Sequence, residues 1–211
     1  MAGNVKVYQS CDRAIRAMNR ENVEAFGRLK MAKWDELHII RTVTAVYTQS
    51  ARRARKRYHG VAWDAYLIGL MMCGIPEKKA RQMVREVITL TWVDRILERV
   101  DPVTQYRFDR ETERKAYRLA EALEVAEKRN AEIDKALRLW SRMLSQYAIN
   151  ITDYAMIHAF EDAGVKRVRW VTQKDERVCS ECASYDEKVF RINEIPTKHW
   201  NCRCYLVPVL N

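Results

Sequence analysis

Apolar side chains recur at every third or fourth position across residues 5–164, and most positions between them are polar or charged. This spacing puts the apolar side chains on one face of a helix, so it predicts helix almost throughout the segment. Gly60 predicts a break between a second and a third helix, and Gly74 predicts the end of the third. The apolar stripes are wide enough to be the faces of a buried core.

Pro76 predicts the start of a fourth helix, because proline fits the first helical turn. This helix is expected to stop near Asp101-Pro102, where the proline lacks the N–H that a continuing helix needs. A long charged helix is expected to open at Asp109. The last helix is expected from Ile133 to Ala163 and is closed by Gly164.

The pattern changes near residue 165. Apolar and basic residues alternate in residues 165–171, which predicts a strand, and further short strands are predicted at 188–192 and 205–207. Three short strands bury too little apolar surface to be stable alone, and a bound metal would offset that deficit. The sequence therefore predicts a mainly α protein: an extended multi-helix body, residues 1–164, followed by a small β-rich zinc-stapled module, residues 165–211.

Cysteine and histidine gather in this C-terminal module. Four of the six cysteines and one of the four histidines lie within residues 179–204. Thiolates and an imidazole at such short spacing are typical ligands of a structural Zn²⁺, which takes four of them. The sequence offers five candidates, which are Cys179, Cys182, His199, Cys202 and Cys204. The Cys-x-x-Cys pair and Cys202 are expected to bind, and the fourth place stays open between His199 and Cys204.

A disulfide or unrelated buried thiols are the alternatives to a metal. Residues 1–12 carry no apolar stretch of the kind that a secretory signal needs. The longest apolar run, Ala65 to Ile75, is too short to span a bilayer. We therefore expect a chain made in a reducing cytosol and independent of membranes, which favours thiolates over a disulfide.

The sequence shows no constellation of catalytic residues. His38, His59 and His158 are isolated from one another and from the cysteines. A zinc deaminase needs His-x-Glu ahead of Pro-Cys-x-x-Cys, whereas His158 and Glu161 are one position too far apart and Val178 replaces the proline. A metal with four protein ligands has no open position for an activated water. We therefore expect neither an enzyme nor a small-molecule substrate.

The net charge of +10 is unevenly distributed. Residues 1–60 hold 13 Lys and Arg against 5 Asp and Glu. The excess peaks in a basic run that consists of Arg52, Arg53, Arg55, Lys56 and Arg57. Such a run attracts polyanions such as nucleic acid, in binding that weakens as salt rises. A solvated helix face and a patch that docks on an acidic protein are the other interpretations.

The C-terminal motifs follow a characteristic order. They are, in sequence, Arg169-Trp170-Val171-Thr172, Asp175-Glu176-Arg177-Val178-Cys179-Ser180-Glu181-Cys182, Lys188-Val189-Phe190, Ile195-Pro196, His199 and Asn201-Cys202-Arg203-Cys204. This order closely resembles the C-terminal signature of phage head morphogenesis proteins, the minor capsid family that includes the phage Mu F-type proteins. Two features depart from that signature. Tyr185 to Lys188 lacks the usual hairpin glycine, so Asp186 is the expected turn former, and Lys198 and Trp200 replace the usual prolines beside the histidine.

The resemblance implies a structural, non-catalytic minor head protein that associates with the portal vertex during head morphogenesis. The implied partners are the portal protein and other capsid components, with packaged double-stranded DNA as a further candidate. The implied location is the virion, in the head interior or at the portal vertex, after assembly in the host cytoplasm. The alternative is a zinc-stapled nucleic-acid-binding regulatory protein, which the basic run would serve equally well.

Overall fold

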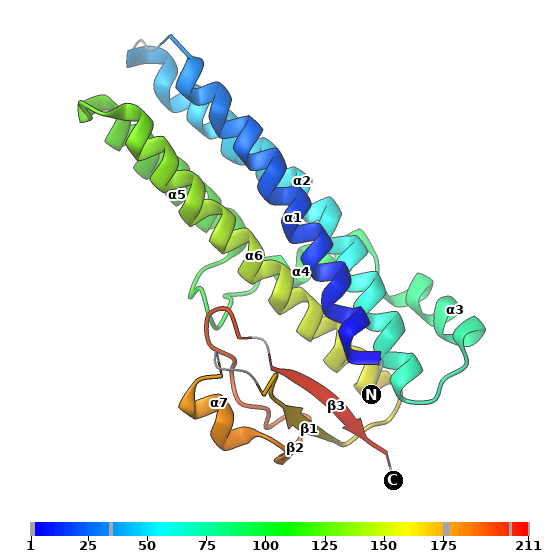
Figure 1. Ribbon diagram of the computed structural model, residues 1–211. Helices are drawn as coiled ribbons and strands as arrows, with labels where there is room; N and C mark the ends of the chain where they lie inside the picture. Colours follow the sequence, from blue (N-terminus) through cyan, green and yellow to red (C-terminus); the bar gives the residue numbers. More distant parts are fainter. Residues whose placement is uncertain (1–2, 34–35, 175–177, 203, 211) are drawn as a thin grey trace.

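Two long helical hairpins, side by side, make up most of the molecule in the computed structural model (Figure 1). The structure describes residues 3–33, 36–174, 178–202 and 204–210. The first hairpin consists of α1 (Gly3–Met31) and α2 (Glu36–Met72), and the second of α5 (Phe108–Val125) and α6 (Arg129–Asp162). Two shorter helices, α3 (Glu77–Val87) and α4 (Leu90–Leu97), connect the hairpins.

The apolar faces of these helices meet in one continuous core. Tyr47 packs edge-on against Phe26 and Trp140, with ring centroids 5.2 Å and 4.8 Å apart. The indole nitrogen of Trp140 donates a hydrogen bond to Ser50 Oγ at 2.8 Å, so this large buried side chain also has a polar partner. The mainly helical class predicted from the periodicity is confirmed. Among the described helices, none is both long and apolar enough to cross a membrane.

α2 contradicts the prediction that Gly60 separates two helices. The helix runs unbroken from Glu36 to Met72, and Gly60 is exposed on its surface. A glycine inside a helix costs only about 1 kcal/mol relative to alanine. The nearby side chains of Tyr58 and Ala62 are fully buried in the core, and their packing outweighs this cost.

The prediction of one continuous fourth helix is also wrong, because the structure divides this segment into α3 and α4. Ile88 leaves the helical conformation, with ψ 94°. Thr89 then begins α4 as its N-cap, and its side-chain oxygen accepts a hydrogen bond from Trp92 N at 3.1 Å. This bond satisfies one of the free donors of a helix start. The apolar periodicity continues across the break and conceals it.

A three-stranded antiparallel sheet lies at the end of the bundle where α1 begins and α6 ends (Figure 1). Its strand order is β2-β1-β3, with bounds Val189–Arg191, Arg167–Val171 and Tyr205–Val209 respectively. The predicted strands are confirmed, whereas the short helix α7 (Ser180–Tyr185) was not predicted. Helix gives way to strand close to residue 165. Separate folding of residues 1–164 and 165–211 stays a prediction.

α2 approaches α6 closely at Gly69. A methyl group added there would lie 2.7 Å from Ala159 Cβ and 3.4 Å from Met156 O. Nothing lies within 4 Å of a methyl group added at Gly60. The same helix thus contains one glycine that the packing requires and one that it does not.

We expect Gly69→Ala and Gly60→Ala to change the free energy of unfolding in opposite directions. Alanine at position 69 pushes α2 and α6 apart, which costs about 1–3 kcal/mol. Alanine at position 60 favours the helix by about 0.5–1 kcal/mol. Denaturant unfolding followed by circular dichroism measures both, and an equal loss of stability in the two variants would contradict the close approach at Gly69.

Candidate metal centre

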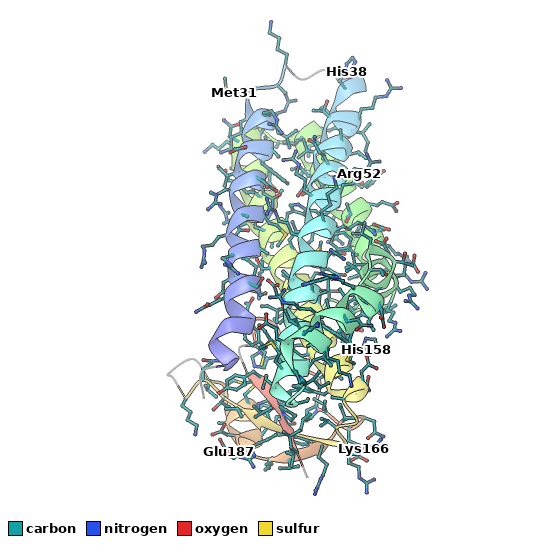
Figure 2. The ribbon with its side chains drawn as sticks, turned by 90° about the vertical axis from the view of Figure 1, so that its right-hand side faces the viewer. Met31, His38, Arg52, His158, Lys166 and Glu187 are labelled. Atoms are coloured by element: carbon teal, nitrogen blue, oxygen red, sulfur yellow. The ribbon has the colours of Figure 1, made fainter. Side chains whose placement is uncertain are left out.

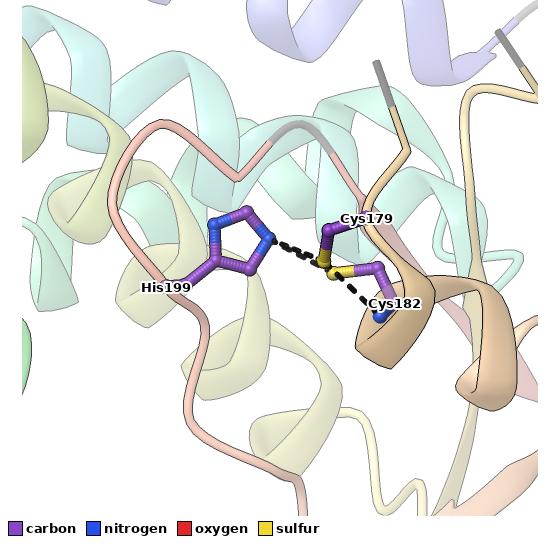
Figure 3. Close-up of side chains that lie close together, drawn as sticks. All are labelled: Cys179, Cys182 and His199. Atoms are coloured by element: carbon purple, nitrogen blue, oxygen red, sulfur yellow. Dashed lines mark hydrogen bonds between the residues drawn. The ribbon is translucent and has the colours of Figure 1, made fainter. Parts of the chain in front are cut away.

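The start of α7 brings Cys179 and Cys182 together. Cys179 is the N-cap of this helix, and its Sγ accepts a hydrogen bond from the backbone N of Cys182 at 3.3 Å. The two sulfur atoms lie next to each other on one side of the turn (Figure 3). A Cys-x-x-Cys turn of this kind offers two thiolates to one metal.

His199 points its ring at both of these sulfurs (Figure 3). Its Nε2 lies 3.2 Å from Cys179 Sγ and 3.1 Å from Cys182 Sγ. Its Nδ1 lies 2.9 Å from the carbonyl oxygen of Trp200. Because a carbonyl oxygen only accepts, Nδ1 carries the proton and donates it, and the lone pair of Nε2 faces the sulfurs. This second hydrogen bond is the usual support of a metal-binding imidazole.

Cys202 and Cys204 form a second group with Cys182. The Sγ atoms of Cys182 and Cys202 lie 3.7 Å apart, and all three sulfurs lie within 4.8 Å of one another. The ligand atoms of Cys179, Cys182 and His199 meet the same 4.8 Å limit. Since Cys182 belongs to both groups, the structure brings the five predicted candidates into one ligand cluster.

The spacing of the ligand cluster fits a tetrahedral metal. With Zn–S bonds of about 2.3 Å, two thiolates of one site lie about 3.8 Å apart, and a thiolate and an imidazole nitrogen about 3.5 Å apart. The corresponding separations in the cluster are 3.7 Å and 3.1–3.2 Å. All six cysteines are free thiols, so none of these sulfurs is held in a disulfide. The cluster can therefore hold a metal ion.

Burial opposes ionisation of two of the thiols. Desolvation raises the pKa of Cys182 to about 12. The hydrogen bond with Cys204, and then burial, raise the pKa of Cys202. The same Cys202–Cys204 hydrogen bond lowers the pKa of Cys204. A metal cation beside these sulfurs would stabilise thiolates that burial disfavours.

Trp170 lies in the sheet beside the Cys204 end of the ligand cluster. Its Nε1 is buried and has no hydrogen-bond partner among the described residues. Trp170 pairs with Leu206 across the sheet. Cys204 lies two residues before Leu206, so its side chain shares a face with Trp170. The Trp170 indole beside Cys204 also lowers the pKa of that thiol.

Asp186 occupies the turn after α7, as predicted. Its Oδ1 accepts hydrogen bonds from Thr172 N at 2.8 Å and Thr172 Oγ1 at 2.9 Å. The Thr172 amide lowers the pKa of this carboxyl. The neighbouring Glu187 takes the left-handed φ of 61° that a glycine would adopt more easily. Side-chain hydrogen bonds thus replace the missing glycine.

Sequence reasoning missed the residues of the helical body that contact the ligand loop, which we define as residues 198–202 and Cys204. Lys198 Nζ lies 2.8 Å from Asp153 Oδ1, although the two residues are 45 positions apart. Asn201 N donates to Gln146 Oε1 at 2.8 Å across 55 positions. No motif or periodicity relates residues so far apart, so no signal in the sequence indicates these contacts.

The structure turns two members of the basic run toward other helices. Arg55 Nη1 lies 2.6 Å from Asp94 Oδ1 and its Nη2 pairs with Asp109. Arg57 pairs with Glu21 of α1. These two arginines therefore serve ion pairs inside the fold.

The other three members form no such ion pair with another helix among the described residues, although Arg53 and Lys56 line the same groove as Arg57 and Glu21. Arg52 and Lys56 are exposed, and Arg52 lies midway along the bundle (Figure 2). Arg53 and Lys56 line a groove of about 580 Å³ between α1 and α2, and Arg13 lines it from α1. The structure thus brings Arg13, which the sequence pattern did not indicate, beside the accessible part of the basic run.

A family model described as phage Mu protein F-like matches residues 71–207. The match covers more than half of the 211 residues and includes the whole ligand cluster. No curated protein and no solved structure matches the chain. The chain therefore belongs to the phage Mu protein F-like family, and this membership indicates a protein of phage head morphogenesis.

Proposed function

We propose that this protein is a minor head component that associates with the portal vertex while the phage head assembles, and that its role is structural. The observation that carries the proposal is the family match, which spans α3 to α6 and the ligand cluster together. Partners of this kind are the portal protein and other capsid components, and the location is the head interior or the portal vertex of the virion.

We infer that the ligand cluster binds one Zn²⁺ through Cys179, Cys182, His199 and Cys202. Three thiolates and one imidazole are a usual donor set for structural zinc. His199 is favoured over Cys204 as the fourth ligand because its Nε2 faces both sulfurs of the Cys-x-x-Cys pair. When bound, the metal supplies folding energy to a module with three short strands. Four protein ligands leave no open position for chemistry, which supports a non-catalytic role.

We further propose that Arg13, Arg52, Arg53 and Lys56 form a polyanion-binding face that contacts double-stranded DNA in the head. Arg55 and Arg57 are excluded because their charges are already paired with acidic residues. The phosphates of double-stranded DNA form a dense polyanion, and surface cations bind them most tightly at low salt.

The purified protein is expected to contain about one zinc per chain, which metal analysis measures. Replacing both Cys179 and Cys182 by serine should abolish zinc binding, because serine offers no thiolate. Cys73→Ser is the matched control, since Cys73 is also a free thiol but lies outside the cluster. A wild-type protein without zinc under reducing conditions would overturn the inference.

The same series identifies the fourth ligand. We expect His199→Ala to weaken zinc binding by more than tenfold, and Cys204→Ser to weaken it less. In the cobalt-substituted protein, the intensity of sulfur-to-metal charge transfer should correspond to three thiolates. A charge-transfer intensity that corresponds to four thiolates, together with unchanged zinc affinity in His199→Ala, would assign the fourth place to Cys204.

Association with heads is tested by sedimentation of assembled particles. We expect the protein to co-sediment with portal and capsid proteins, and to be captured by purified portal protein. The zinc-free double-serine variant shows whether the C-terminal module takes part. A protein that stays free of particles and binds a specific DNA sequence would contradict the head proposal and favour a regulatory protein.

DNA binding should depend steeply on salt. Neutralising Arg52, Arg53 and Lys56 with glutamine should lower the slope of log affinity against log salt by about 3, because each phosphate contact contributes about 0.9. Fluorescence anisotropy with a labelled duplex measures the slope. Replacing the exposed Lys78 and Lys79 of α3 by glutamine is the control. An equal effect in the control would mean that the basic face is not a specific surface.

A further inference from the structure

The ligand loop rests on α6 through a buried ion pair. Lys198 Nζ lies 2.8 Å from Asp153 Oδ1, and the side chains are 9% and 16% exposed. An ammonium removed from water to this extent needs a partner, because desolvation disfavours the unpaired charge. Asp153 therefore fixes where the residue just before His199 lies.

Lys198 also holds the other end of the loop. Its Nζ donates to the carbonyl oxygen of Cys204 at 2.7 Å. Lys198 and Cys204 bracket His199 and Cys202 in the sequence. One amino group thus connects both ends of the segment that carries the second half of the ligand cluster.

Tyr8 of α1 joins this network. Its hydroxyl lies 2.8 Å from Asp153 Oδ1 and 3.2 Å from Cys204 O, and it accepts from Lys198 Nζ at 3.3 Å. Burial, and then the Asp153 carboxylate, raise the pKa of Tyr8 well above its ordinary value, so the hydroxyl keeps its proton as a donor. The start of α1 is therefore bound to the same atoms as the ligand loop.

The middle of the loop has its own contacts with α6. Asn201 N donates to Gln146 Oε1 at 2.8 Å, and the Gln146 amide donates to Asn150 Oδ1 at 2.7 Å. Arg142 lies over the Trp200 ring, 5.3 Å from its centroid. The α6 residues involved are spaced three or four apart, so one stripe of the helix faces the loop. One hydrogen bond and one cation–π contact thus set the middle of the loop on that stripe, and the Gln146–Asn150 bond holds the Gln146 amide in place.

We propose that Lys198 is a positioning residue for the metal ligands, and that metal binding at the cluster stabilises the first turns of α1 through the Lys198–Asp153–Tyr8 network. The proposal rests on the inferred metal site. It goes beyond that site because it couples the cluster to a helix more than 190 positions away in the sequence. Linkage requires the coupling to be reciprocal, so contacts that order α1 also tighten metal binding.

Lys198→Met tests the positioning role, because methionine keeps much of the side-chain length and removes the charge. We expect zinc affinity, measured by competition with a chromophoric chelator, to fall by about 10- to 100-fold at unchanged stoichiometry. Lys188→Met is the matched control at an exposed lysine of the same module, and should change the affinity less than about twofold. Lys198→Arg should recover much of the lost affinity.

Hydrogen exchange tests the coupling to α1. In the wild type, adding zinc to the chelator-treated protein should slow amide exchange in residues 8–18. In Lys198→Met the same addition should leave that segment unchanged. A wild-type affinity in Lys198→Met, or undiminished zinc-dependent protection of α1 in that variant, would overturn the proposal. Absence of zinc from the wild type would instead refute the metal site itself.

A double variant keeps the test valid if Lys198→Met leaves Asp153 buried without a partner and fails to fold. Combining Lys198→Met with Asp153→Leu removes both charges, a change that buried ion pairs often tolerate. A double variant with native circular dichroism, weakened zinc binding and no coupling to α1 supports the positioning role. Full zinc affinity in that folded protein shows that the pair does not position the ligands.

Discussion

α6 constrains the rest of the molecule because one helix serves two interfaces. In its middle, Trp140 is buried in the core and the carbonyl of Leu144 accepts a hydrogen bond from Tyr58 Oη at 2.9 Å. Further on, Gln146 and Asp153 contact the ligand loop. A rotation of α6 that preserved one interface would break the other. The buried polar contacts raise the free-energy cost of such a rotation, because a hydrogen bond lost in a dry interior is not replaced by one to water.

The helical body could be predicted as far as burial determines it. Apolar periodicity indicated the long helices because each must bury one stripe, and the core confirms those stripes. Periodicity gave the wrong helix boundaries where local backbone conformation determines whether a helix continues. Gly60 disfavours helix only weakly, and the packing of α2 outweighs that effect. The Thr89 cap, in contrast, divides α3 from α4 without interrupting the apolar pattern. Neither outcome depends on which residues are apolar.

The ligand cluster was predictable in its chemistry and not in its surroundings. Few side chains bind zinc, so the residue types alone selected the five candidates that the structure brings together. Ion pairs carry no such signature. Arg55 and Arg57 belong to one basic run, yet they pair with acidic residues 39 and 36 positions away. Lys198 likewise finds Asp153 only because α6 passes beneath the loop. Charge density in a sequence therefore overstates the charge that remains available for binding.

Lys198 and Trp200 stand where the resemblance to the family signature led us to expect prolines, and both contact α6 in this chain. Proline would order a ligand loop by fixing its backbone before any folding occurs. Here the loop gains its order from contacts with Asp153 and Arg142, which exist only once the helical body has formed. A loop ordered by proline is held through its own backbone, whereas this one is held by side-chain contacts with α6. The two predicted parts of the chain thus share contacts at the ligand cluster, where side chains of α6 hold the loop that carries His199 and Cys202.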